Sequence, residues 1–226
     1  MLSSEAVYRH RFIDGRPFLR GPGKVVCVGR NYAAHARELG NPIPDEPLLF
    51  IKPATALVAL EQPLVIARRF QPCHYETEIS VLIGKTLTEA APDAAREAIA
   101  GIGVALDLTL RELQDRLKAE GQPWEKAKAF DGSCGLSPFV PAGGLDLDAI
   151  HLRLVRNGVE AQHGDSGQML FPILDLLCRI SAYFTLVPGD VVLTGTPEGV
   201  GALADGDSLR AELPGLLAVD TTVVYR

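Results

Sequence analysis

The sequence has no apolar run of the roughly 18 residues that a membrane-spanning helix needs. Its first residues, MLSSEAVYRHRFIDG, carry no apolar signal core, so a cytoplasmic location without membrane insertion is expected. Basic residues are outnumbered, because 22 Lys and Arg stand against 28 Asp and Glu, and the net charge is −6. Binding to nucleic acid or to an anionic membrane would require a basic surface, so neither is an expected partner.

Cysteine is sparse, and several catalytic motifs are missing. The four cysteines, Cys27, Cys73, Cys134 and Cys178, form no CxxC pair, so neither a zinc ribbon nor a redox dithiol is expected. They are expected to be reduced and mostly buried. The Gly-rich turn at 195–201 lacks the spacing of a nucleotide-binding loop, and neither GxSxG nor HExxH occurs. Nucleotide binding and standard serine hydrolysis are therefore not expected.

Many short segments separated by turns predict a strand-rich protein. Hydrophobic residues make up 47% of the 226 residues, which is enough for a substantial core. Strands are expected at 24–29, 48–52, 74–84, 102–108, 190–194, 208–213 and 219–225, with a hairpin at 152–161 around Asn157-Gly158. Helices are expected at 31–40, with Asn31 as its N-cap, and at 91–100, 110–120 and 170–184. Strands outnumber helices without alternating with them, which predicts an α+β fold.

Three carboxylates are candidates for a metal site. Glu76 and Glu78 lie two residues apart on an expected strand, so both side chains point to the same face. Asp107 lies in the apolar stretch IGVALDLTL, where an unpaired charge is costly. Oxygen ligands of this kind suit Mg²⁺, Mn²⁺ or Ca²⁺. The alternatives are a solvated acidic strand face for the two glutamates and a cap on the helix that begins near Leu110 for Asp107.

Other polar residues have spacings that place them together. His35 and Glu38 lie three apart on one helix face, where a His–Glu pair can deprotonate a water; the alternative is a surface ion pair. Arg111 and Gln114 also lie three apart, on the helix that follows Asp107. Lys128 could stabilise an enolate or bind a substrate carboxylate, although lysines in a charged turn are usually solvated. In the Gly-rich turn, Thr196 offers a hydroxyl to a pocket.

Six runs of this sequence, taken in order, resemble the fumarylacetoacetate hydrolase family over residues 24–226. They are VVCVGRNYAAHARELG, EPLLFIKPATAL, HYETEISVLIG, GVALDLTLRELQ, GQPWEKAKAFDGSC and PGDVVLTGTPEGVG. The likeness is strongest to short single-domain members, which include acylpyruvate hydrolases and oxaloacetate-processing enzymes. It implies a β-rich roll of mixed sheets with short helices, usually a homodimer. Residues 1–23 then form an N-terminal arm or hairpin before a catalytic domain at 24–226.

The resemblance also implies a role for each candidate residue. The metal ligands of the family fall on Glu76, Glu78 and Asp107, and the metal is Mg²⁺ or Mn²⁺. Its catalytic residues fall on His35, Glu38 and Lys128, with the His–Glu pair on a segment, 31–40, that closes over the substrate. Its substrate-binding positions fall on Arg111, Gln114 and Thr196, which hold the 2-oxo acid end. Arg30, Tyr32 and Lys52 lie in matching runs without an assigned role.

The expected reaction is metal-dependent hydrolysis of a carbon–carbon bond in a 3-acylpyruvate, through an enolate, to pyruvate and a carboxylic acid. The same enolate allows oxaloacetate tautomerisation or decarboxylation, or isomerisation of a 2-hydroxyhepta-2,4-diene-1,7-dioate. A metal-binding structural domain without catalysis is the alternative from another class. Fumarylacetoacetate itself is not the expected substrate, because only about 23 residues precede the catalytic domain, whereas the enzymes that cleave it carry an extra N-terminal domain.

Overall fold

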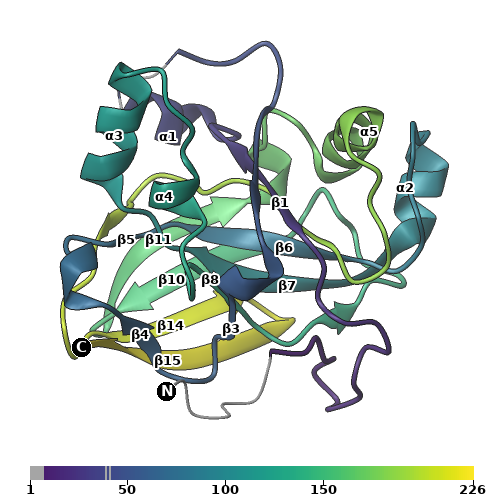
Figure 1. Cartoon of the computed structure of the whole chain (residues 1–226). Coiled ribbons are helices and arrows are strands. Elements are labelled where there is room, and N and C mark those ends of the chain that lie inside the picture. The colour runs from purple at the N-terminus through teal and green to yellow at the C-terminus, as the bar shows by residue number, and fades with distance from the viewer. Residues whose placement is uncertain (1–7, 39, 41) are drawn as a thin grey trace.

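The computed structural model describes residues 8–38, 40 and 42–226 (Figure 1). Within these residues the strands form an eight-stranded, a five-stranded and a two-stranded sheet, and the helices are short. The α+β class and the roll of mixed sheets are thereby confirmed. Residues 1–7 of the predicted arm and Leu39 of the first predicted helix lie outside the described residues. None of the described helices is both long and apolar enough to cross a membrane.

The larger sheet carries most of the predicted strands. Its order in space is β2 (Leu48–Lys52), β1 (Val25–Gly29), β12 (Val191–Leu193), β6 (Thr77–Ile83), β7 (Ile99–Asp107), β8 (Cys134–Leu136) and β3 (Leu57–Ala59), with β9 (Val140–Pro141) also paired to β7. Two pairs, β1–β12 and β3–β8, are parallel, and the others are antiparallel. Strand β6 is buried at every residue, because both faces of the sheet are covered.

The smaller sheet is antiparallel except at one edge. Its order is β11 (Val159–Asp165), β10 (His151–Arg156), β14 (Ser208–Leu213), β15 (Leu217–Tyr225) and β4 (Leu64–Ile66), the last pair being parallel. Burial alternates along β14 and β15, so one face packs on the core and the other faces solvent. Asn157 and Gly158 have φ angles of 52° and 82°, as the two-residue turn of a hairpin requires, which confirms the predicted hairpin.

Two hydrophobic clusters cover the two faces of the larger sheet. The main cluster takes residues from both sheets, among them Ile79 and Val104 from the larger and Leu154 and Val223 from the smaller. The second cluster lies on the opposite face, and Tyr8, Phe12 and Phe18 of the N-terminal segment pack against it. In that segment Arg11 forms an antiparallel bridge with Pro17, and Phe12 bridges to Phe139.

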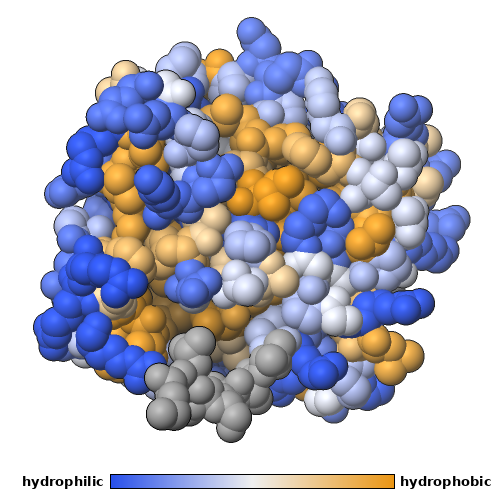
Figure 2. Space-filling model, viewed as in Figure 1, coloured by the Kyte–Doolittle hydropathy of each residue, from blue (hydrophilic) through white to orange (hydrophobic). Residues whose placement is uncertain are grey.

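The helices lie around the sheets in two groups (Figure 1). One group is α1 (Ala33–Glu38), α3 (Arg111–Ala119) and α4 (Glu125–Lys128), and the other is α2 (Pro92–Ala98) and α5 (Ile173–Tyr183). The described residues also form three short 3₁₀ helices, η1 (Ala54–Ala56), η2 (Arg68–Phe70) and η3 (Ser166–Gln168). In the same view, hydrophilic side chains dominate the surface over α3, with hydrophobic ones showing between them (Figure 2).

Three local predictions need correction. The strand expected at 74–84 is divided into β5 (His74–Tyr75) and β6, because β5 pairs with β13 (Gly201–Ala202) and the chain changes partner at Glu76. Asn31 does not cap α1; its side chain instead donates to the carbonyls of Phe171 and Thr194, at 3.0 and 2.8 Å, and accepts from the Phe171 N–H. Those backbone groups are buried and need partners.

The third correction concerns the segment WEKAK, where the sequence indicates a charged turn. Residues 125–128 form the short helix α4, and its two lysines have opposite environments. Lys126 is exposed, whereas Lys128 is buried against the larger sheet. The solvated alternative for Lys128 is therefore wrong.

Candidate active site

The three predicted carboxylates meet at the ends of two neighbouring strands. Glu78 lies in β6, Glu76 directly precedes that strand, and Asp107 ends the adjacent strand β7. The two segments are joined by a hydrogen bond from the Asp107 N–H to the Glu76 carbonyl, 2.8 Å long. All three side chains are buried, and one ligand atom from each lies within 4.8 Å of the others. The solvated-face alternative for the glutamates is wrong.

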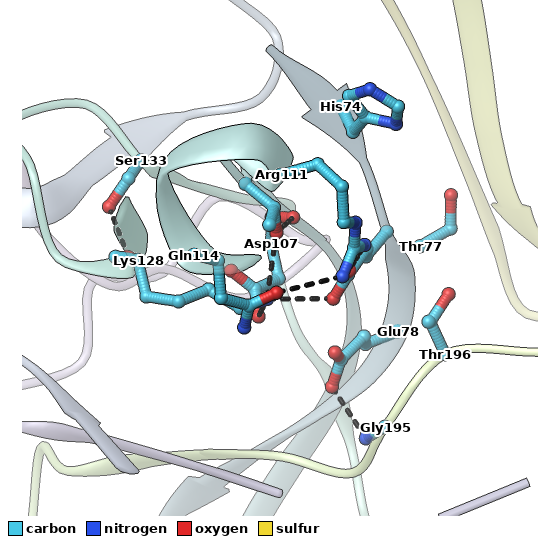
Figure 3. A network of polar contacts seen from close by, with 12 residues as sticks. His74, Thr77, Glu78, Asp107, Arg111, Gln114, Lys128, Ser133, Gly195 and Thr196 are labelled. Atoms are coloured by element: carbon cyan, nitrogen blue, oxygen red, sulfur yellow. Dashed lines mark hydrogen bonds and ion pairs between the residues drawn. The ribbon is translucent and has the colours of Figure 1, made fainter. Parts of the chain in front are cut away.

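Lys128 connects two of these carboxylates (Figure 3). Its Nζ donates to Glu76 Oε2 at 2.7 Å, to Asp107 Oδ2 at 2.8 Å and to Thr109 Oγ1 at 2.7 Å. An ammonium group has three N–H donors, so these contacts use all of them. Lys128 therefore orients the acidic cluster, and donation to a substrate would require it to exchange one of these partners.

Lys52 is a second cation that pairs with Asp107. Its side chain is fully buried at the end of β2, and its Nζ lies 2.8 Å from Asp107 Oδ1. The same Nζ donates to the Lys128 carbonyl and to both oxygens of Ser133, the latter at 3.1 Å. Asp107 is thus paired with two lysines and does not cap α3, whose N-cap position is occupied by Leu110 without a side-chain bond.

The charges in the cluster shift the pKa values in opposite directions. Burial raises the pKa of Glu76, but the charges of Lys128 and Arg111 outweigh burial and lower it below its usual value. Burial likewise acts to lower the pKa of Lys128, and the charges of Asp107 and Glu76 outweigh it and raise the pKa. Burial, with the charges of Asp107 and Glu76, raises the pKa of Glu78 well above its usual value. Glu78 is therefore the carboxylate whose charge its surroundings compensate least.

A divalent metal ion fits this donor set. In the described part of the chain no Lys, Arg or His forms an ion pair with Glu78; its Oε2 accepts one hydrogen bond, from the Gly195 N–H at 2.5 Å (Figure 3). Three carboxylates offer the hard oxygen ligands that Mg²⁺ and Mn²⁺ prefer. A dication beside Glu78 would compensate the charge that its surroundings disfavour.

His35 and Glu38 form the predicted pair on α1. His35 Nδ1 lies 3.1 Å from Glu38 Oε2, and the other carboxylate oxygen accepts from the Gly199 N–H at 3.0 Å. The pair therefore joins α1 to the Gly-rich turn. Gly195 in that turn has a φ of +94°, and a Cβ there would lie 2.7 Å from the Cβ of Asn31, so glycine permits the close approach of the two segments.

Seven of the nine predicted site residues line one cavity, and they are His35, Glu76, Glu78, Arg111, Gln114, Lys128 and Thr196. Glu38 and Asp107 contact members of this group. Arg111 forms an ion pair with Glu76 and donates to Gln114 Oε1 at 2.9 Å. The cavity also has an apolar wall, formed by Val28, Leu48, Phe50 and Trp124.

The sequence and structure comparisons agree with this geometry. A family model described as "Fumarylacetoacetate (FAA) hydrolase C-terminal" matches residues 24–224. The chain belongs to the fumarylacetoacetate hydrolase family. This confirms the resemblance that the six sequence runs indicated.

Three similar proteins in the fumarylacetoacetate hydrolase family have informative names. Oxaloacetate tautomerase YcgM of Escherichia coli (strain K12) is 51% identical over 211 residues, 92% of this chain and 96% of that protein. A crystal structure of a fumarylacetoacetate hydrolase family protein from Yersinia pestis CO92 is 50% identical, with a TM-score of 0.93, and covers 96% of this chain and 100% of its own. Fumarylpyruvate hydrolase from Pseudomonas aeruginosa, in complex with Mn²⁺ and pyruvate, is 35% identical, with a TM-score of 0.91, over 100% and 99% of the two chains.

The sequence gives no role to Lys52 and does not single out Gln162, although both make several contacts near the site of this fumarylacetoacetate hydrolase family member. Lys52 ends an apolar strand immediately before a proline, and a lysine in that position is the signal that could have drawn attention to it. Gln162 lies in β11 of the smaller sheet and donates to Thr196 Oγ1 at 2.8 Å and to the Pro197 carbonyl at 2.9 Å. It also accepts from the Thr77 N–H at 2.9 Å. Nothing near Gln162 in the sequence indicates that it joins the two sheets.

Proposed function

We propose that this chain catalyses the interconversion of the enol and keto forms of oxaloacetate. The observation that carries the proposal is the 51% identity, over 92% of the chain, to a protein named oxaloacetate tautomerase. The reaction moves one proton between C3 and the oxygen on C2, with an enolate between the two forms. It needs a positive environment for the enolate oxygen and a group that carries the proton. The cavity offers both.

Glu76, Glu78 and Asp107 are the residues that would hold a divalent ion, Mg²⁺ or Mn²⁺. When bound, the ion would supply positive charge that stabilises a negative 2-oxo oxygen. The Mn²⁺ in the fumarylpyruvate hydrolase complex supports a metal in this chain. The charge balance also supports a metal, because a dication and the oxaloacetate dianion together add no net charge to the buried site.

His35 and Glu38 are proposed to carry the proton. The imidazole of His35 is buried and lines the cavity, and Glu38 orients it through the 3.1 Å contact. The pair would remove the proton from C3 of the keto form and return it in the reverse direction. Arg111, Gln114 and Thr196 would hold the 2-oxo acid end. Lys128 would contribute by holding Glu76 and Asp107 in place.

The expected hydrolysis of acylpyruvates stays as a second candidate, and the pyruvate in the fumarylpyruvate hydrolase complex favours it. It begins from the same type of enolate site but also requires an attacking water, which the His35–Glu38 pair would deprotonate. Decarboxylation of oxaloacetate would need no attacking water. The homodimer and the cytoplasmic location stay predictions from the family resemblance and from the composition.

The test is to follow the ultraviolet absorbance of enol-oxaloacetate with purified protein and Mg²⁺. Glu38→Gln is expected to lower kcat by about 100-fold, because the base loses the carboxylate that orients it. The Mg²⁺ concentration that this variant needs for half-maximal turnover should be unchanged, since Glu38 lies outside the acidic cluster. Glu112→Gln, an exposed change on α3, is the matched control and should keep wild-type turnover.

Two outcomes would contradict this proposal. Full turnover in Glu38→Gln would remove the His–Glu pair from the mechanism. The hydrolase would be established instead if wild-type protein does not convert the enol faster than buffer alone, yet releases acetate and pyruvate from acetylpyruvate in a proton NMR time course. Adding EDTA to either reaction tests the metal requirement.

A further inference from the structure

The outer part of the cavity holds two cations that the mechanism above does not use. Arg30 and Lys118 both line the cavity together with the predicted site residues. Among the described residues, the side chain of Arg30 forms no ion pair or hydrogen bond. Within the part of the chain that the structure describes, the one acidic partner of Lys118 is Asp115, 4.0 Å away, and that carboxylate is largely exposed. Two positive groups therefore face the cavity with little compensating charge.

One face of helix α3 lines the cavity from the acidic cluster to this outer part. Arg111, Gln114 and Lys118 lie at i, i+3 and i+7, so they share one helix face, and all three line the cavity. Gln114 is 3% exposed, whereas the side chain of Lys118 is 26% exposed. Four residues of helix separate these two by about 6 Å along the axis, a length comparable to a four-carbon diacid.

Lys118 is held in this position by its neighbours. Its Nζ lies 5.1 Å from the centre of the Trp124 ring, which also lines the cavity. Burial, with the nearby charges of Arg111 and Arg30, lowers the pKa of Lys118 below its usual value. The three cations are therefore close enough to repel one another, and an anion between them would relieve that repulsion.

Arg30 has an unusual backbone conformation. Its φ of +60° lies in the left-handed region, which is costly for a residue with a side chain. Such strain persists where the surroundings impose it. Here the next residue, Asn31, is fixed by its three side-chain hydrogen bonds to Phe171 and Thr194. The chain is thus held where the side chain of Arg30 reaches the cavity.

We infer that Arg30 and Lys118 form a second carboxylate subsite, which binds the C4 carboxylate of a four-carbon 2-oxo diacid while Arg111, Gln114 and Thr196 hold the other end. This inference rests on the proposed function and deepens it. The distal acyl group of acetylpyruvate, like that of any acylpyruvate with an uncharged acyl group, would leave both cations unpaired. The subsite therefore selects oxaloacetate over acylpyruvates whose acyl group is uncharged.

The test compares two unreactive ligands by calorimetry in buffer with Mg²⁺. Malate carries the distal carboxylate, and lactate has the same 2-hydroxy acid end without it. Wild-type protein should bind malate about tenfold or more tightly than lactate, the preference expected for charge-assisted hydrogen bonds. Lys118→Met and Arg30→Asn should each lose most of this preference. Asparagine tolerates a positive φ, so the second variant keeps the backbone conformation.

Arg116→Met is the matched control, because it removes one positive charge from an exposed position of the same helix. It should keep the wild-type preference. With enol-oxaloacetate as substrate, Lys118→Met should raise KM about tenfold and leave kcat within about twofold.

The outcomes separate this inference from the proposed function. Equal affinity of wild-type protein for malate and lactate, or a preference that survives in both variants, would overturn the subsite. If both variants lose the preference for malate but the wild-type protein has no tautomerase activity, the subsite is supported and the proposed function is refuted.

Discussion

At the scale of single residues, the pairing of Lys52 with Asp107 decides the geometry of the acidic cluster. Both side chains are almost completely buried, and the Lys52 Nζ also donates to Ser133 and to the Lys128 carbonyl. Removing one member of a buried ion pair leaves the other charge without compensation, which costs more than the pair itself contributes. Lys52 therefore acts on the site through Asp107 and α4.

Lys52→Met is expected to lower the free energy of unfolding by about 3 to 5 kcal/mol, the usual cost of breaking a buried pair from one side. Urea denaturation measures it. Adding Asp107→Asn should recover part of the loss, because the double variant no longer buries an unpaired charge. Lys85→Met removes a lysine paired with Glu97 at the surface and should have a much smaller effect. Equal losses in the two lysine variants would contradict this account.

At the scale of elements, the described part of the N-terminal arm is tied to the larger sheet by His10. The imidazole is buried, with Nε2 2.9 Å from the Gly189 carbonyl and Nδ1 3.1 Å from the Tyr8 hydroxyl. Burial lowers the pKa of His10 below 6.5, although the Gly189 carbonyl and Asp190 act in the opposite direction. Protonation is therefore easier in the unfolded chain than in the folded one.

This shift predicts a stability that depends on pH. The contribution of His10 is complete above its unfolded pKa and is lost as the pH falls through the folded pKa, because the unfolded chain then binds the extra proton. The urea midpoint should fall as the pH is lowered from about 8 to about 5, and it should fall less in His10→Phe. His163→Phe, at an exposed histidine, should keep the wild-type slope. Identical slopes in wild-type protein and His10→Phe would exclude His10 as the cause.

The boundaries of the elements depended on more than local sequence. The hairpin at Asn157-Gly158 was predictable because its turn requires positive φ at both central residues. Helix α4 was not, since its four residues give no periodic signal and its burial comes from β2 and the cluster around Asp107. The break at Glu76 was also hidden, because β5 and β6 belong to different sheets and the run of residues is continuous.

At the scale of the whole molecule, the proposed metal ligands lie at the ends of two central strands of the larger sheet. Strands β6 and β7 pair with each other in the middle of the larger sheet, and the main core packs between that sheet and the smaller one. An ion held by both strands would bind the folded chain and not the unfolded one. Its binding free energy would therefore add to the stability of the whole molecule.

At a free Mg²⁺ concentration 100 times its dissociation constant, binding would add about 2.7 kcal/mol to the free energy of unfolding. The melting temperature in Mg²⁺ is therefore expected to be higher than in EDTA. Glu78→Gln should abolish this shift. Without metal, it should melt at or above the wild-type temperature at neutral pH, because the surroundings of Glu78 disfavour its charge. Glu97→Gln, an exposed change, is the control. A full Mg²⁺ shift in Glu78→Gln would remove this residue from the metal site.

The sequence by itself determined the family, the α+β class and the pairs whose members are close in the chain. Glu76 with Glu78, His35 with Glu38 and Arg111 with Gln114 are each two or three residues apart, and the period of a strand or helix decides which face they share. These local spacings survive folding, which is why nearly all of the predicted site residues gather at one cavity.

Only the tertiary structure decided which distant segments complete the site. Lys52 and Lys128 meet at Asp107 although they are 76 residues apart, and Gln162 reaches Thr196 from the other sheet. Arg30 and Lys118 come together at the cavity in the same way. Such contacts follow from how sheets and helices pack, and no local pattern records them, because a buried charge is stabilised by whichever groups the packing brings within reach.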